Sequence, residues 1–258
     1  MNRITVENKE NGIAVLTMNK GRVNTMDLDF MEEMCLALED LEYNSNIRGL
    51  IITSALSDYF SFGAALNEFY QVDKERLKIF IRRKQEFNLR LWGCRLTTIA
   101  LVNGIAQREG FALAMGCDYR IGTSQDLNLT LNYTSTGLLA GSEFNLLQKK
   151  LSFETLSRLE FPETLTNNLD FIQTGILHEI NTTEPMQRAF DVMNQLLTRP
   201  DNIVAKQKLS MIRPALNTIQ DTRSEEISDT VARIMKTSTQ AHLETYIQKM
   251  QISGECIK

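Results

Sequence analysis

Short apolar segments alternate with longer segments of helical periodicity through the first half of the chain. The segments 13–18, 49–53 and 98–102 predict strands, and the unbroken apolar run 49–53 is typical of a strand covered on both faces. Residues 28–41 and 74–92 carry apolar side chains at spacings of three and four, which indicates helices with one buried face. Strands that are followed by helices in this way predict an α/β fold with a largely parallel sheet.

The two ends of the chain modify this pattern. An Asn11-Gly12 turn predicts a hairpin between residues 4–6 and the strand 13–18. Strand signals fade after about Leu138, and from Pro185 onward the periodicity is helical, with Pro200 and Pro214 marking helix starts or breaks. We therefore expect a β/α core over residues 1–195 and a helical C-terminal region over residues 196–258.

Composition limits the class of protein. Of 258 residues, 43% are apolar and 23% are charged, which is ordinary for a globular chain with a sizeable core. The sequence contains no run of eighteen apolar residues, so it predicts no membrane helix. The formal net charge is −4, so the chain does not have the overall positive charge that is typical of a nucleic-acid-binding protein. The first residues resemble neither a secretory signal nor a presequence, so we expect a cytoplasmic protein, or one of the mitochondrial matrix if a presequence has been removed.

The usual reactive motifs are missing. The four cysteines, Cys35, Cys94, Cys117 and Cys256, are far apart and form no C-x-x-C pair, so we expect reduced structural thiols. The two histidines, at positions 178 and 242, belong to no zinc or nucleophile motif. No phosphate-binding loop, dinucleotide fingerprint or G-x-S-x-G elbow is present, and we expect no metal.

Three short segments resemble one known family. Residues 60–66 read Phe-Ser-Phe-Gly-Ala-Ala-Leu, residues 103–110 read Asn-Gly-Ile-Ala-Gln-Arg-Glu-Gly, and residues 117–121 read Cys-Asp-Tyr-Arg-Ile. They are similar in order and spacing to the F-S-A-G-A-D-L, N-G-x-A-x-G-G-G and C-D-x-R-I signatures of the crotonase (enoyl-CoA hydratase/isomerase) superfamily. Within it, the pairs Val23-Asn24 and Leu131-Asn132 resemble those of Δ3,Δ2-enoyl-CoA isomerases.

This resemblance implies a crotonase-type β/α spiral with a helical C-terminal region. It implies that the backbone N–H groups of Ala64 and Glu109 form an oxyanion hole for a coenzyme A thioester, which is the substrate, with no other cofactor. The resemblance also implies a homotrimer or hexamer, and an apolar stripe in the C-terminal region is consistent with subunit contacts. That stripe comprises Met211, Ile212, Ile227, Val231, Ile234 and Met235. The remaining residues expected to bind the substrate are Arg22, Phe62, Gly63, Ala65, Leu66, Asn132 and Lys208.

The chain departs from the family at the residues that carry the chemistry. Tyr133 stands where isomerases have the glutamate that moves a proton from C2 to C4, and Ala112 stands where hydratases have another glutamate. A phenol with a pKa near 10 is a poor base at neutral pH, so we expect weak isomerisation of 3-enoyl-CoA. Glu109 and Glu143 are the carboxylates that could substitute for the missing base, although a solvated or ion-paired Glu143 is the simpler expectation.

Three functions therefore remain open at this point. The first is an enoyl-CoA isomerase with an altered acid/base set. The second is another thioester reaction, such as hydrolysis or decarboxylation, that needs mainly the oxyanion hole. The third is a non-catalytic acyl-CoA-binding protein.

Overall fold

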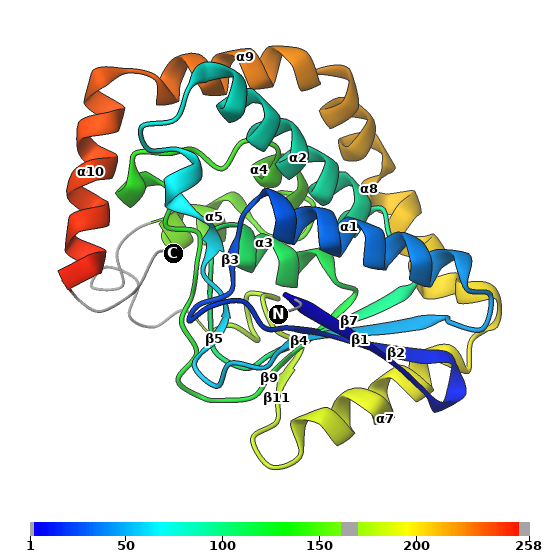
Figure 1. Ribbon diagram of the computed structural model, residues 1–258. Helices are drawn as coiled ribbons and strands as arrows, with labels where there is room; N and C mark the ends of the chain where they lie inside the picture. Colours follow the sequence, from blue (N-terminus) through cyan, green and yellow to red (C-terminus); the bar gives the residue numbers. More distant parts are fainter. Residues whose placement is uncertain (1–2, 161–169, 253–258) are drawn as a thin grey trace.

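A computed structural model describes residues 3–160 and 170–252, and its centre is a six-stranded sheet (Figure 1). The strand order is β1-β2-β4-β7-β9-β11. The first two strands form the antiparallel hairpin that the Asn11-Gly12 turn predicts, and the other neighbours are parallel. The strands are β1 (Ile4–Lys9), β2 (Ile13–Met18), β4 (Gly49–Ser54), β7 (Thr97–Val102), β9 (Tyr119–Gly122) and β11 (Glu179–Ile180).

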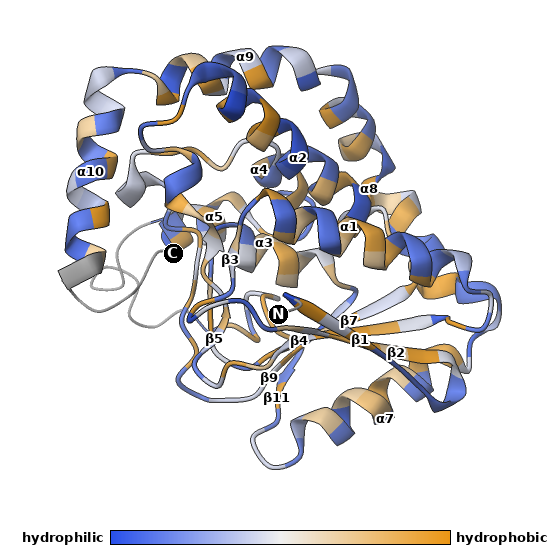
Figure 2. Ribbon diagram, in the orientation of Figure 1, coloured by the Kyte–Doolittle hydropathy of each residue, from blue (hydrophilic) through white to orange (hydrophobic). Residues whose placement is uncertain are grey.

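Helices cover both faces of this sheet. Along β2 and β7 alternate side chains enter two different cores, because successive residues of a strand point to opposite faces. Ile99 and Leu101 pack against α7 (Pro185–Leu197), whereas Ala100 and Val102 belong to the larger core under α1 (Leu28–Tyr43) and α2 (Lys74–Trp92). The hydropathy colouring alternates along α1 and α2, as expected of helices with one apolar face (Figure 2). The expectation of an α/β fold with a doubly covered sheet is thus confirmed.

Two smaller parallel sheets carry the first two of the three segments that resemble the crotonase signatures, and the third leads into β9 of the central sheet. One has the order β10-β8-β5, and the other pairs β3 with β6. These strands are β3 (Thr25–Met26), β5 (Tyr59–Ser61), β6 (Gly63–Ala64), β8 (Ile105–Gln107) and β10 (Leu129–Thr130). Three short helices lie beside them: α3 (Glu109–Gly116), α4 (Ser142–Leu147) and α5 (Phe153–Glu160).

Three helices form the C-terminal region and arch over the core (Figure 1). They are α8 (Ile203–Asp221), α9 (Arg223–Ile234) and α10 (Thr237–Ile252). Pro200 begins a short 3-10 helix, but the expectation that Pro214 starts or breaks a helix is wrong. Pro214 lies inside α8 on its exposed face, where a carbonyl that loses its helical partner can bond to water. The expected boundary at residue 195 falls within α7, which packs on the central sheet.

The apolar stripe of the C-terminal region is largely internal. Ile212, Ile227, Val231 and Ile234 are buried within the chain itself, and they belong to the main core. Only Met211 and Met235 are exposed, at 65% and 44%. Most of this stripe therefore covers the chain's own core and is not free for a subunit contact.

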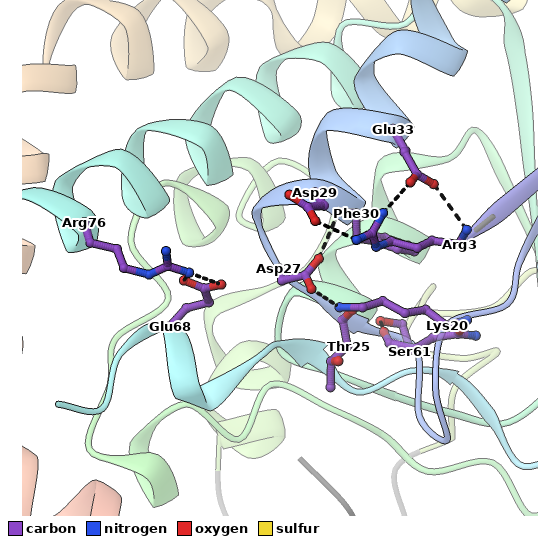
Figure 3. A network of polar contacts seen from close by, with 11 residues as sticks. Arg3, Lys20, Thr25, Asp27, Asp29, Phe30, Glu33, Ser61, Glu68 and Arg76 are labelled. Atoms are coloured by element: carbon purple, nitrogen blue, oxygen red, sulfur yellow. Dashed lines mark hydrogen bonds and ion pairs between the residues drawn. The ribbon is translucent and has the colours of Figure 1, made fainter. Parts of the chain in front are cut away.

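A polar network fixes the segment that leads into the candidate site (Figure 3). Lys20 Nζ lies 2.6 Å from Asp27 Oδ2 and donates to the Thr25 carbonyl at 2.9 Å. Asp27 also caps α1 by accepting from the Phe30 N–H. These contacts hold β3 against the start of α1, and β3 in turn pairs with β6. In the same view Arg76 pairs with the buried Glu68 at 3.0 Å.

Candidate active site

Parallel pairing of β5 with β8 brings Ala64 and Glu109 together. Each strand leads directly into one of these residues, and the carboxyl ends of parallel strands lie at the same edge of a sheet. Gly110 permits the close approach, because a Cβ at this position would lie 2.1 Å from the Ser61 carbonyl oxygen. Ala64 and Glu109 therefore lie close together, and their role as an oxyanion hole stays a prediction.

The Glu109 side chain occupies the place where the two backbone N–H groups converge. Its Oε2 accepts a hydrogen bond from the Ala64 N–H at 2.8 Å. The Glu109 backbone N–H, at the start of α3, also lowers the pKa of this carboxylate. A buried N–H group beside a helix N-terminus is a good site for an anionic oxygen, and here the oxygen belongs to the chain itself.

A buried cluster of three charged side chains surrounds this contact. Lys84 Nζ lies 3.4 Å from Glu109 Oε1 and 3.0 Å from Glu143 Oε1. The three side chains are 8%, 3% and 0% exposed. Glu143 is therefore ion-paired and not solvated, which is one of the two outcomes that the sequence suggested.

The environments of the two carboxylates move their pKa values in opposite directions. Burial raises the pKa of Glu109, but Lys84, Arg108 and the two backbone N–H groups outweigh burial, so its pKa lies below the usual value. Burial and the neighbouring Glu109 raise the pKa of Glu143, against the opposing charge of Lys84. Burial lowers the pKa of Lys84, but the two carboxylates raise it further, so the amine is charged. Glu109 is thus the ionised partner, and Glu143 is the group that takes up a proton more readily.

Tyr133 lies beside this cluster with its ring 6.0 Å from Lys84 Nζ. The side chain is 1% exposed, and its hydroxyl has no hydrogen-bond partner among the described residues. Burial and the nearby carboxylates raise the pKa of Tyr133 well above 10. The phenol is therefore neutral, and it can donate a hydrogen bond but cannot act as a base at neutral pH.

A cavity of about 640 Å³ opens next to these groups. Lys84, Glu109 and Tyr133 form one end, and the wall continues over Leu138–Ala140 to residues of α9. Apolar side chains of this wall include Phe69, Ile81, Phe144 and Ile234. The wall also carries charged side chains, among them Glu160, Glu226 and Arg233. A cavity of a few hundred Å³ that has both apolar and charged walls has room for an acyl chain attached to a polar head.

Apart from Glu109, neither Ala64 nor any other residue predicted to bind the substrate lines the cavity. Phe62, Gly63, Ala65 and Leu66 are buried on either side of Ala64 in the chain. Arg22 is exposed in the turn before β3, next to Val23, whose carbonyl accepts from the Phe62 N–H. Asn132 has a positive φ of 49° immediately before Tyr133. A contact of these residues with coenzyme A stays a prediction.

Lys208 does not have the free ammonium group that a phosphate contact requires. Its Nζ lies 3.1 Å from Asp118 Oδ2, and the two side chains are 5% and 7% exposed. Asp118 also accepts from the Thr98 N–H at 2.8 Å. Lys208 of α8 is therefore in an internal ion pair with the residue that precedes β9, and it is not retained in the candidate site.

The Cys-Asp-Tyr-Arg-Ile segment likewise has a structural role. Arg120 is buried and donates to the carbonyls of Cys117, Gly175 and Ile176. Cys94 and Cys117 are buried free thiols as expected, Cys35 is partly buried, and Cys256 lies outside the described residues. Burial raises the pKa of the Cys117 thiol to about 11, which makes it a poor nucleophile.

Sequence reasoning missed Lys84 as a residue of the site. The sequence does contain a sign of this role. Lys84 lies three residues after Ile81 and three before Phe87, which places it on the buried face of the helix. A lysine on a buried stripe needs a charged partner, and Glu109 and Glu143 are those partners. Arg108 is also buried, with its guanidinium 4.6 Å from the centre of the Phe62 ring.

Two classes of feature are not seen in the described part of the chain. Among residues 3–160 and 170–252, no group of three or more His, Cys, Asp or Glu side chains could hold a metal ion. Within the same ranges, every helix is too short or too polar to cross a membrane.

Comparisons with known proteins agree with this architecture. A family model described as Enoyl-CoA hydratase/isomerase matches residues 8–253. The rat protein "Enoyl-CoA delta isomerase 1, mitochondrial" is 28% identical over 257 residues, which cover 96% of this chain and 88% of the rat protein. The "Short-chain-enoyl-CoA hydratase" of Clostridium acetobutylicum is 26% identical over 98% of both chains. The crystal structure of human mitochondrial delta3-delta2-enoyl-CoA isomerase superposes with a TM-score of 0.89 at 26% identity, covering 98% of this chain and 99% of the human one.

The chain therefore belongs to the enoyl-CoA hydratase/isomerase family and has the crotonase fold. The resemblance to isomerases of this family is confirmed by both the sequence relatives and the structural one.

Proposed function

We propose that this protein binds the coenzyme A thioester of an enoyl or acyl group, with the thioester oxygen at the N–H groups of Ala64 and Glu109. The observation that carries the proposal is the 2.8 Å hydrogen bond from the Ala64 N–H to a carboxylate oxygen, because it demonstrates a donor aimed at an oxygen in a buried position. The acyl chain would extend into the 640 Å³ cavity. Coenzyme A would follow Phe62, Gly63, Ala65 and Leu66, with Arg22 available for a phosphate and Asn132 near the acyl group.

The reaction that we propose is isomerisation of the double bond of an enoyl-CoA, at a low rate. A thioester whose oxygen lies in the hole is polarised towards an enolate, so a proton at C2 becomes easier to remove. Tyr133 replaces the glutamate that isomerases use, and its raised pKa leaves it unsuited to accept this proton. The names of the isomerase relatives support this reaction class over hydrolysis or decarboxylation.

A non-catalytic acyl-CoA-binding protein is the second candidate. The observation that favours it is that a carboxylate of the chain occupies the hole while Tyr133 supplies no base. We also propose a homotrimer or hexamer, on the resemblance alone. We propose a cytoplasmic location, or the mitochondrial matrix, since the name of the rat relative describes that protein as mitochondrial.

One experiment separates these functions. Calorimetric titration with hexanoyl-CoA and 3-hexenoyl-CoA measures binding, and turnover of 3-hexenoyl-CoA is followed in parallel. We expect binding with slow turnover. Binding with no turnover selects the non-catalytic protein, and the absence of any heat up to millimolar ligand contradicts thioester binding altogether.

A further inference from the structure

We propose that the Glu109 carboxylate is an internal ligand of the oxyanion hole, which a thioester must displace in order to bind. The inference rests on the proposed function, because it concerns the same two N–H groups. The Ala64 N–H donates a hydrogen bond to this carboxylate at 2.8 Å. An N–H group has one proton to donate, so the carboxylate and a thioester oxygen compete for it.

The backbone opposite the carboxylate is shaped to receive it. Gly63 has a φ of +86°, and a Cβ at this position would lie 2.9 Å from Glu109 Oε2. The same Cβ would lie 2.7 Å from the Gln107 carbonyl oxygen. Only glycine leaves room for both the carboxylate and the close approach of the two segments.

Arg108 holds the entrance of α3 in a conformation that brings Glu109 to the hole. Its φ of 48° and ψ of −119° lie in a region that non-glycine residues rarely adopt. The strain is offset by a 2.8 Å hydrogen bond from Nη2 to the Phe62 carbonyl and by stacking on the Phe62 ring. Arg108 and Glu109 are thus consecutive residues. Both stand where the crotonase signature that residues 103–110 resemble has glycine.

The displaced carboxylate has a place to go. Lys84 is already 3.4 Å from Glu109 Oε1, and the cavity begins at Lys84, Glu109 and Tyr133. A carboxylate that leaves the Ala64 N–H would therefore still have Lys84 as a charged partner and the cavity beside it.

The test compares the affinity of hexanoyl-CoA, a saturated ester that cannot be isomerised, for four proteins. Glu109→Ala removes the internal ligand but keeps the backbone N–H, and we expect it to bind on the order of 10- to 100-fold more tightly than the unmodified protein. Glu109→Gln keeps the shape with a weaker, neutral acceptor, and we expect an intermediate affinity. Glu226→Gln is the matched control, because it removes an equal charge from the cavity wall without contact to the Ala64 N–H.

Free coenzyme A serves as the second control, since it lacks the thioester oxygen. Its affinity should be the same for the unmodified protein and Glu109→Ala. Equal affinity of these two proteins for hexanoyl-CoA would overturn the inference and leave the proposed function standing. An equal gain in Glu226→Gln, or an equal gain for free coenzyme A, would overturn it as well, because charge alone would then explain the effect. No binding of hexanoyl-CoA to any of the folded variants, each checked by its thermal transition, would overturn the proposed function and the inference together.

Discussion

Lys84 Nζ lies 3.0 Å from Glu143 Oε1, and this pair joins α2 to α4 beneath the candidate site. Both side chains are buried, and Glu109 shares the same lysine. The cluster therefore links the stability of the core to the side chain that accepts from the Ala64 N–H. Buried charges of this kind are costly when a partner is lost, because the remaining charge is left without solvent or counter-charge.

We expect Lys84→Met to lower the free energy of unfolding by about 3–5 kcal/mol. The substitution leaves two buried carboxylates without their shared cation. Adding Glu143→Gln to Lys84→Met should recover part of the loss, because one of the unpaired charges is then absent. Urea unfolding of the single and double variants measures both effects. A loss of unfolding free energy below about 1 kcal/mol in Lys84→Met would contradict the role of Lys84 as the shared cation of the two carboxylates.

Lys208→Met tests the revised role of Lys208. Loss of its buried ion pair with Asp118 should also lower the free energy of unfolding by about 3–5 kcal/mol. Acyl-CoA affinity should change little, since the lysine has no free ammonium group for a phosphate. Thermal unfolding and calorimetric titration measure the two quantities, and a tenfold weaker affinity with normal stability would restore Lys208 to the binding site.

Tyr133→Glu should raise the rate of 3-hexenoyl-CoA isomerisation. A positioned acid/base group contributes about 10²–10⁴-fold, and Lys84 lies close enough to compensate the new charge. Tyr133→Gln is the matched control, because it has similar size and polarity to the glutamate but accepts no proton. Gain of activity in the glutamine variant would show that Tyr133 limits the rate by its bulk instead.

The unmodified protein offers a separate check on Tyr133. If it isomerises 3-hexenoyl-CoA at an ordinary enzymatic rate, our interpretation of Tyr133 is wrong. Glu143 is then the first carboxylate to examine, and loss of activity in Glu143→Gln would identify it as the relocated base.

His178 should make the protein less stable in mild acid. Burial and then the charge of Arg120 lower the pKa of His178 to about 4, and its Nδ1 accepts from the Arg120 N–H at 3.1 Å. Lys150 lowers this pKa further, whereas Asp118 raises it. The unfolded chain has a pKa near 6.5 at this residue, so it binds the proton more readily than the folded chain. The stabilisation is complete above pH 6.5 and is lost as the pH falls towards 4.

His178→Asn removes this titration but keeps an acceptor for the Arg120 N–H. Between pH 7 and pH 4 its Tm should fall less than that of the unmodified protein. The ring is partly exposed to solvent, so we expect a difference of only about 2–4 °C. Calorimetric scans at several pH values measure it, and identical pH profiles would exclude His178 as the cause.

The proposed assembly is tested by sedimentation. A homotrimer or hexamer has three or six times the chain mass of 29.4 kDa. Because Ile212, Ile227, Val231 and Ile234 are buried within the chain, surfaces other than this stripe must supply most of the contact. A mass near 29.4 kDa at micromolar concentration would contradict the oligomer.

The local pattern of the sequence determined the elements of this fold. Apolar spacings of three and four predicted α1 and α2, and Asp27 and Asp73 accept hydrogen bonds as their caps. Short apolar runs predicted β4 and β7, and the unbroken run of β4 predicted that both of its faces are covered. These features depend on residues close together in the chain, so periodicity and capping suffice to find them. The resemblance of short motifs then placed Ala64 and Glu109 at one site.

Only the tertiary structure decided what the side chains at that site do. Glu109 reaches the Ala64 N–H across 45 positions of sequence, and Lys84 meets Glu143 from a different helix. The same holds for Lys208, which the resemblance placed near a phosphate and which the fold pairs with Asp118, 90 positions away. The physical reason is that a buried charge takes whichever partner the packing of distant segments brings within about 3 Å, and no local pattern of residues encodes that distance.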